Sequence, residues 1–291
     1  MYVAIRDGVL MAGGYRSLVE GLADLGLDSL EVDVRKDRRL RWLEPREGEQ
    51  WVLLDSEAAI REWRQEYERH RVRPCALLLA NDFNAPDMKA EMDWVLWSVR
   101  LAAEAGVPVC RIDSAMSGQK ELPREERVAL FVQRARELVA ATADTGVNFG
   151  IENHGHQGND PVWMEAVIKG VGSERFGYTM DTGNFYWAGH PLSKVYQILE
   201  QFAAWARHTH VKNIKYPPDT REKQREVGWE YGKYVSPIYE GDIDHRRVAR
   251  ILEHAGYQGP FCIEDESLGH YQPEERREVL RKDAAYLKSL V

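Results

Sequence analysis

The chain has 291 residues, of which 44% are hydrophobic and 30% charged, and its 39 basic and 47 acidic side chains give a net charge of -8. This length can bury one large core, so we expect a single domain over residues 1–291. The acidic balance disfavours nucleic acid as a partner, and no apolar stretch approaches the roughly 18 residues that span a bilayer. The N-terminus shows no secretion signal, which predicts a cytoplasmic protein without a membrane partner.

Short β-rich runs alternate with longer segments of helical period along the whole chain. Eight such runs are expected to be strands: Val3–Arg6, Ser29–Val34, Ala76–Ala80, Val109–Asp113, Asn148–Asn153, Gly177–Asp181, His208–Lys212 and Phe261–Asp265. A (β/α)₈ barrel requires eight parallel strands separated by helices, and the sequence offers this number. The expected fold class is therefore α/β, a single TIM barrel.

The segments between the strands carry apolar stripes at helical spacing. Five of them are expected to be helices: Asp87–Gly106, Glu125–Thr145, a segment opened by Pro191, Asp244–Gly256 and Pro273–Leu290. The connections from helix to strand are short, whereas many connections from strand to helix are longer. This asymmetry is typical of a barrel with its functional groups at one rim.

Two segments interrupt the repeat. The charge-rich stretch Arg35–Gln50 is expected to be a solvated excursion after the second strand. The long loop Tyr216–Glu240 follows the seventh strand and contains several aromatic side chains, which disfavour disorder. A loop of this length in a compact domain is usually functional, and we expect either a lid over the rim or a contact between subunits.

The three cysteines, Cys75, Cys110 and Cys262, all lie inside apolar runs. An odd number of widely separated cysteines does not fit a disulfide framework, so we expect buried, reduced thiols.

Four chemically related residues, Glu152, Asp181, His210 and Glu264, each stand where an apolar run ends. The first three are 29 residues apart, about one strand–loop–helix unit, and Glu264 follows 54 residues later. The ends of neighbouring parallel strands meet at one rim, where these acids would repel one another unless a cation neutralised them. Oxygen ligands with one imidazole suit Mn²⁺ best among the candidates Mn²⁺, Mg²⁺, Co²⁺ and Zn²⁺. The sequence therefore predicts one divalent metal ion.

The sequence around these residues resembles the xylose isomerase-like TIM-barrel superfamily, the sugar phosphate isomerase/epimerase group. The matching stretches are Ile151–His154, Met180–Asn184, His208–Lys212, Glu240–Asp244 and Gly256–Glu264. The resemblance implies that Glu152, Asp181, His210 and Glu264 bind one metal ion, in agreement with the strand-end pattern. It also implies an enzyme that acts on a small carbohydrate.

In related epimerases, the first and last metal-binding glutamates exchange the substrate proton. The resemblance thus implies catalytic roles for Glu152 and Glu264 in isomerising or epimerising a keto-sugar, keto-polyol or related carbohydrate through an enediolate bound to the metal. A lyase or dehydratase that acts on an oxidised sugar or inosose would use the same first step and stays an alternative. Asn184 stands where some ketose epimerases and three-zinc nucleases have histidine, which counts against a close relation to either. A carbohydrate-binding barrel without activity is a further alternative.

Three neighbours are expected to bind substrate: His154, Lys212 and Asn184. His154 and Lys212 each lie two positions past a metal ligand, on the same side of an extended chain. The alternative for His154 is a turn-stabilising role, and the alternative for Lys212 is an ion pair at the strand end. A homo-oligomer is also compatible with the sequence.

Several other residues occupy plausible rim positions. Glu31 and Asp33 end the second strand, whereas Arg111 and Asp113 are expected to form a salt bridge inside the barrel. Tyr186 and Trp187 either stack on a sugar or pack against the next helix.

Overall fold

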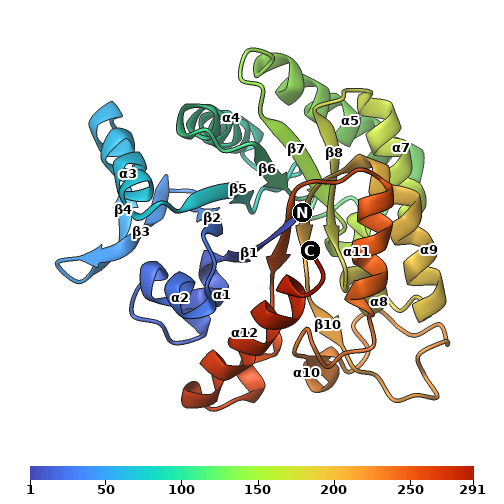
Figure 1. Cartoon of the computed structure of the whole chain (residues 1–291). Coiled ribbons are helices and arrows are strands. Elements are labelled where there is room, and N and C mark those ends of the chain that lie inside the picture. The colour runs from blue at the N-terminus through green and yellow to red at the C-terminus, as the bar shows by residue number, and fades with distance from the viewer.

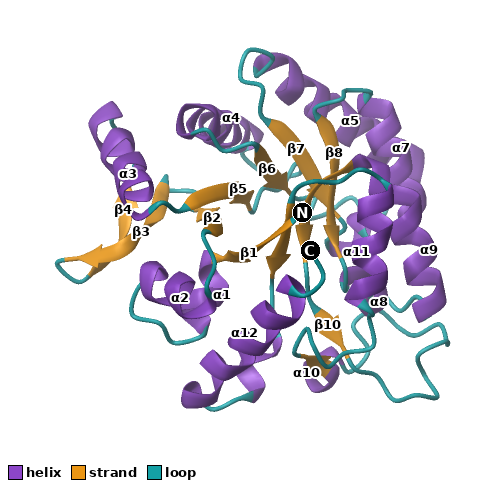
Figure 2. Ribbon diagram, viewed as in Figure 1, coloured by secondary structure: helices purple, strands orange, loops and turns teal.

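The computed structural model describes residues 1–291 and contains eight parallel strands in a barrel surrounded by helices (Figure 1, Figure 2). The strand order is β12-β1-β2-β5-β6-β7-β8-β9, and every pair in this order is parallel. Two backbone hydrogen bonds join the ends of the sheet, from Val211 N to Cys262 O (2.8 Å) and from Glu264 N to Val211 O (2.9 Å). The predicted α/β TIM barrel is confirmed.

All eight predicted strands are present, with bounds shifted by a few residues. The barrel strands are β1 (Tyr2–Arg6), β2 (Ser29–Val34), β5 (Arg73–Leu79), β6 (Val109–Ile112), β7 (Asn148–Glu152), β8 (Phe176–Asp181), β9 (Ala206–His210) and β12 (Pro260–Ile263). Outside the barrel lie β3 (Arg39–Arg46), β4 (Glu49–Leu53), β10 (Asn213–Ile214) and β11 (Val235–Ser236).

The five predicted helical segments also form helices. The helices are α1 (Asp7–Ala12), α2 (Leu18–Leu25), α3 (Glu57–His70), α4 (Met88–Ala105), α5 (Arg124–Ala141), α6 (Gly155–Gly158), α7 (Pro161–Val171), α8 (Asn184–Trp187), α9 (Leu192–Phe202), α10 (Tyr231–Tyr234), α11 (His245–His254) and α12 (Pro273–Lys288). In α4, Asp87 Oδ1 accepts a hydrogen bond from Ala90 N (3.0 Å), and Gly106 ends the helix at a φ of 70°. These are the start and stop that the side-chain types favour.

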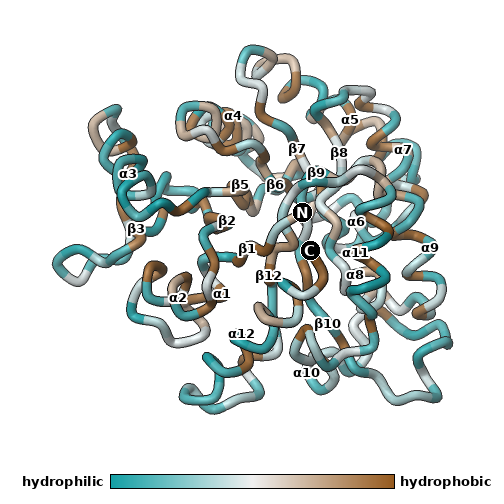
Figure 3. The backbone as a smooth tube through the Cα atoms, viewed as in Figure 1, coloured by the Kyte–Doolittle hydropathy of each residue, from teal (hydrophilic) through white to brown (hydrophobic).

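Successive side chains along each strand point to opposite faces of the sheet and so lie in two different environments. In β1, Val3 and Ile5 belong to the large core of 68 buried residues that fills the space between strands and helices, whereas Ala4 packs with Cys75 and Cys262 in a separate small cluster. Figure 3 shows hydrophilic colour on many of the peripheral loops, and hydrophobic colour is found mainly within strands and helices. The next position on the side of Ala4 is Arg6, so small side chains give way to charged ones toward the carboxyl end of the barrel.

The segment Arg35–Gln50 is an excursion after the second strand and is largely exposed, as expected, but it is more ordered than a solvated loop. The segment contributes to the antiparallel hairpin β3–β4, which projects from one side of the barrel beside α3 (Figure 1). Its Leu40, Trp42 and Leu43 are buried, and Trp63 of α3 donates its indole N–H to Arg41 O (3.2 Å). The dense charges of the segment concealed an alternating apolar face that packs against α3.

The long segment Tyr216–Glu240 is folded back on itself by the pairing of β10 with β11. The ring of Tyr216 is buried among three aromatic rings, those of Tyr186, Trp229 and Tyr234, at centroid distances of 4.9, 5.7 and 5.6 Å. Tyr186 packs against Tyr216 of this segment, whereas its expected packing partner was the next helix.

The three cysteines are buried and unpaired, as predicted. No helix combines the length and the apolar content that crossing a bilayer would require.

Two buried carboxyl groups link the end of β12 to α12. Asp265 and Asp283 are 4% and 0% exposed, and Asp283 Oδ1 also accepts a hydrogen bond from Tyr239 N (3.2 Å). Burial and the neighbouring Asp265 raise the pKa of Asp283 well above its usual value, so the folded state keeps a proton on Asp283 to a higher pH than the unfolded chain does. An unfolded aspartate releases its proton near about pH 3.9. The free energy of unfolding therefore falls as the pH rises above that value.

We expect Asp283→Asn to stabilise the protein at alkaline pH. The amide can keep the acceptor for Tyr239 and can donate to Asp265, so the folded state no longer depends on a bound proton. Urea unfolding at pH 6 and pH 9 should show a gain of roughly 1–3 kcal/mol at pH 9, the scale of an unsatisfied buried polar group, and a smaller gain at pH 6. The exposed control Asp55→Asn should show no such dependence. A variant no more stable than wild type at pH 9 would contradict the raised pKa of Asp283.

Candidate metal centre

The four side chains predicted as metal ligands meet at the carboxyl end of the barrel. Glu152 ends β7, Asp181 ends β8, His210 ends β9, and Glu264 follows β12 directly. Each offers one ligand atom, and these atoms all lie within 4.8 Å of one another. All four residues are buried. The barrel closure described above is what brings Glu264 to the other three.

His210 presents its two ring nitrogens to different groups. Its Nδ1 lies 3.1 Å from Glu152 Oε2 and 3.4 Å from Glu264 Oε2, so it faces the cluster. Its Nε2 lies 2.8 Å from Oε2 of Glu31, which projects inward from β2. Glu31 was expected only as a rim residue, and its contact with a candidate ligand was not foreseen.

Each carboxylate of the cluster is paired with a different cation. Arg6 of β1 contacts Glu264, and Arg111 of β6 contacts Glu152. Lys212 Nζ lies 2.9 Å from Asp181 Oδ2, 3.5 Å from Glu264 Oε2 and 2.9 Å from Glu266 Oε1. The negative charge of the cluster is thus partly compensated by the protein itself.

The turn after β8 fixes the orientation of Asp181. Its Oδ1 accepts hydrogen bonds from Gly183 N and Asn184 N, each 2.8 Å long, which leaves Oδ2 directed toward the cluster. The Asn184 side chain donates to Glu152 Oε1 (3.1 Å) and so ties two of the carboxylates together. A Cβ on Gly183 would lie 2.8 Å from Lys212 Cγ, so the close approach of this lysine requires glycine at position 183.

Three of the facing atoms are buried without a hydrogen-bond partner: Asp181 Oδ2, His210 Nδ1 and Glu264 Oε2. The nearby Lys212 and Glu152 groups are close enough for charge attraction but are not directed as hydrogen bonds. Buried polar atoms are rarely left in this state, and three of them around one point fit a cation. Two oxygens and one imidazole nitrogen are suitable donors for a divalent metal ion. The residues present therefore fit a metal.

The pKa values reflect the same crowding. Burial raises the pKa of Asp181 to about 8; Lys212 opposes this rise, whereas Glu264 and Glu152 add to it. Burial alone would also raise the pKa of Glu264, but His210, Lys212 and Arg6 lower it to about 2. The carboxylates cannot all be ionised comfortably at neutral pH without a further positive charge.

The pKa values of His210 and Lys212 are both raised by the surrounding carboxylates. Burial alone would lower the pKa of His210, but Glu264, Glu31 and Glu152 raise it well above its usual value. Burial would likewise lower the pKa of Lys212, which Asp181 and Glu264 raise. For Glu31, the effect of burial is outweighed by His210 and His208, and its pKa is lowered.

His154 lies beside the cluster but not in it. Its Nδ1 is 2.8 Å from Asp113 Oδ1, and its side chain is 43% exposed. The hydrogen bond to Asp113 raises the pKa of His154. Asp113 also pairs with Arg111 at 2.8 Å, the salt bridge expected from the sequence. The structure adds that Arg111 reaches Glu152.

Arg6, Glu266 and Tyr231 are neighbours of the cluster that the sequence analysis did not identify. Arg6 ends β1 at the same level as the cluster residues. This strand-end position is the sequence feature that could have pointed to it. Tyr231 belongs to the segment Tyr216–Glu240, and its hydroxyl donates to Glu266, which in turn contacts Lys212. The segment therefore lies at the rim beside the cluster.

Comparison with known proteins gives a consistent result. The family model described as xylose isomerase-like TIM barrel matches residues 19–290, whereas no curated protein matches the sequence. Similar solved structures include the IOLI protein with a bound zinc atom, which is 16% identical with a TM-score of 0.73 and covers 99% of this chain and 98% of that one. A D-tagatose 3-epimerase-like protein is 16% identical with a TM-score of 0.66 and the same coverage. Mannonate dehydratase from Streptococcus suis serotype 2 is 14% identical with a TM-score of 0.67, covering 100% of this chain and 93% of that one.

At these identities the structural likeness establishes a shared fold. The family match covers nearly the whole sequence. This chain belongs to the xylose isomerase-like TIM-barrel family.

Proposed function

We propose that this protein is a divalent-metal-dependent isomerase or epimerase of a keto-sugar, keto-polyol or related small carbohydrate. The observation that carries the proposal is the group of four buried donors with three unpartnered atoms facing one another. The family, and a structural neighbour described as D-tagatose 3-epimerase-like, support the reaction class.

The metal ligands in this proposal are Glu152, Asp181, His210 and Glu264. Their oxygen-rich set favours Mn²⁺, and Mg²⁺, Co²⁺ or Zn²⁺ would also fit. When bound, such an ion would polarise a substrate carbonyl and make the neighbouring C–H more acidic.

Glu152 and Glu264 are the residues proposed to move the proton. They come from β7 and β12, so they approach the centre from two sides. Against the effect of burial, Arg111 and His210 lower the pKa of Glu152, and His210, Lys212 and Arg6 lower the pKa of Glu264, so both are ionised at neutral pH. A carboxylate of low pKa is a weak base, so either can remove a C–H proton only when that proton is acidified. The carboxylate that takes the proton becomes a carboxylic acid and can return that proton to the adjacent carbon, which isomerises the sugar.

Lys212, Asn184 and His154 are the proposed substrate contacts. Lys212 carries a positive charge inside the centre and can stabilise the oxygen anion of an enediolate. Asn184 holds Glu152 in place through its amide. The exposed side chain of His154 can reach a hydroxyl farther along the substrate. Tyr231, from the segment Tyr216–Glu240, lies at the rim beside these residues and donates its hydroxyl to Glu266.

The second candidate is a lyase or dehydratase that acts on an oxidised sugar or inosose. One observation favours it: His154 is held by Asp113 with its other ring nitrogen free, an arrangement that can protonate a leaving hydroxyl group. A structural neighbour described as mannonate dehydratase is consistent with this alternative.

Glu264→Gln should abolish turnover while leaving the fold intact. The amide cannot accept the proton, and the loss of a charged ligand weakens metal binding, so we expect at least a hundredfold fall in kcat. The exposed residue Glu253 on α11 provides the matched control Glu253→Gln, which should retain full activity. Metal content and thermal unfolding are measured in parallel. Retained activity of Glu264→Gln would exclude its essential role.

Turnover in deuterated water distinguishes the two reactions. An isomerase or epimerase should incorporate deuterium at the reacting carbon with no loss of water, because the proton that is removed exchanges with solvent. A dehydratase should give a product lighter by one water molecule. Mass spectrometry after incubation with a panel of keto-sugars and sugar acids gives the readout. Water loss without an isomerised product would overturn the primary proposal.

A further inference from the structure

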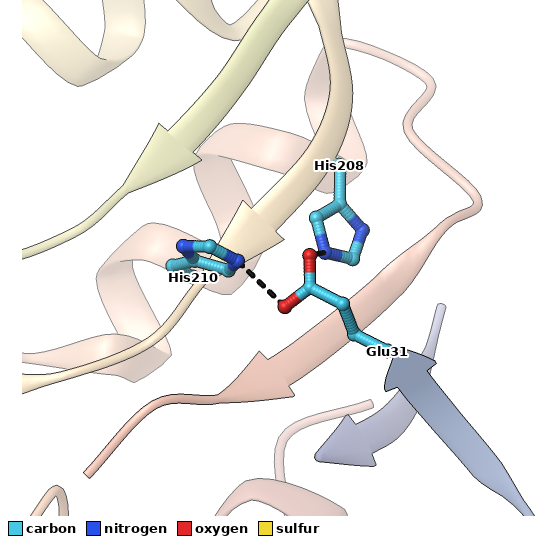
Figure 4. Close-up of side chains that lie close together, drawn as sticks. All are labelled: Glu31, His208 and His210. Carbon is cyan, nitrogen blue, oxygen red and sulfur yellow. Dashed lines mark hydrogen bonds and ion pairs between the residues drawn. The ribbon is translucent and has the colours of Figure 1, made fainter. Parts of the chain in front are cut away.

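Glu31 lies inside the barrel beside His210, one of the proposed metal ligands. It projects from β2, is 0% exposed, and faces two histidines of β9. His208 Nε2 lies 3.0 Å from Glu31 Oε1, and His210 Nε2 lies 2.8 Å from Glu31 Oε2. Figure 4 shows the carboxylate between the two imidazole rings. Each carboxylate oxygen therefore has its own histidine.

The contact with His210 decides which of its nitrogens carries a proton. An ionised carboxylate only accepts hydrogen bonds, so the Nε2 of His210 must donate. In a neutral imidazole, the other nitrogen then has a free lone pair. That nitrogen is Nδ1, which is buried without a hydrogen-bond partner and faces Glu152 and Glu264.

We propose that Glu31 is a positioning residue that holds His210 with its proton on Nε2 and its Nδ1 directed at the metal centre. His208 Nε2 lies 3.0 Å from the second oxygen of Glu31, and this close packing opposes rotation of the carboxylate away from His210. Arg6 completes the arrangement, because its Nε lies 3.6 Å from Glu31 Oε2 while its Nη1 contacts Glu264. This inference rests on the proposed function, since it assumes that His210 is a metal ligand. Carboxylates that orient a ligating histidine typically change metal affinity about 10- to 100-fold.

The same three residues, Glu31, His208 and His210, also bring ligand atoms within 4.8 Å of one another. A second metal ion there would have to take the Nε2 of His210 from its hydrogen bond with Glu31. That hydrogen bond is 2.8 Å long and favours the single-ion arrangement, whereas the 3.0 Å contact from His208 Nε2 to Glu31 Oε1 is not directed as a hydrogen bond. The stoichiometry of zinc binding separates these arrangements.

The test compares zinc affinity in metal-stripped full-length protein, measured by competition with a chromophoric chelator. Glu31→Gln should bind zinc about 10- to 100-fold more weakly than wild type. The matched control is Glu66→Gln, because Glu66 of α3 is also buried and accepts hydrogen bonds from Glu44 N (2.9 Å) and Arg46 (3.0 Å), away from the centre. It should leave zinc affinity within twofold even if it lowers thermal stability.

A second measurement uses wild-type protein and does not depend on the folding of a variant. Long-range proton–nitrogen NMR spectra of zinc-loaded protein labelled with ¹⁵N-histidine should show His210 bound through Nδ1 with a proton on Nε2. The resonance is assigned by its loss in His210→Gln. Zinc bound through Nε2, two zinc ions per chain, or an unchanged affinity in Glu31→Gln would each overturn the inference. Wild-type protein that binds no divalent metal at all would instead overturn the proposed function.

Discussion

The repulsion among three carboxylates in one buried volume is the constraint on which the centre depends. Glu152, Asp181 and Glu264 reach this volume from three strands, and each meets a cation that comes from yet another part of the barrel. The compensation is incomplete, because the pKa of Asp181 still lies near 8. A divalent cation can displace the proton that such a carboxyl group would otherwise hold at neutral pH. The ion would supply the charge that the protein's own cations do not.

The barrel accommodates these charges because the two faces of each strand have different roles. The outward side chains stabilise the fold, and the inward side chains at the carboxyl end form the cluster. Outward residues such as Val3 and Ile5 join the large apolar core against the helices. The inward residues near the amino end, among them Ala4 and Cys262, are small and close-packed. The inward positions at the carboxyl end can therefore be charged without weakening the apolar layer that stabilises the fold. The charges in the polar interior must still be compensated, so cations and carboxylates from different strands lie in contact there.

The sequence indicated the four residues of the cluster but not their partners. Glu152 and His210 were predictable because each ends an apolar run, and parallel strands bring such ends to one rim. Arg6 was not, because an arginine at the end of a strand looks the same whether it meets solvent or Glu264. Its partner lies 258 residues away, on a strand that becomes its neighbour only when the barrel closes. The β3–β4 hairpin was missed for a different reason, since its charges outnumber the few apolar residues that α3 covers.

The choice between isomerisation and elimination depends on a group outside the metal ligands. Isomerisation needs only a base and an acid near adjacent carbons, and Glu152 and Glu264 approach the centre from two sides. Elimination needs an acid that reaches one carbon farther, and His154 is the exposed candidate, two residues beyond Glu152 at the end of the same strand. If Glu152 removed the proton, His154 would act from the same side, and water would leave in the syn sense. If Glu264 removed it, the two groups would act from different strands, β7 and β12, and an anti course would be accessible. The stereochemistry of any elimination would therefore identify which glutamate is the base.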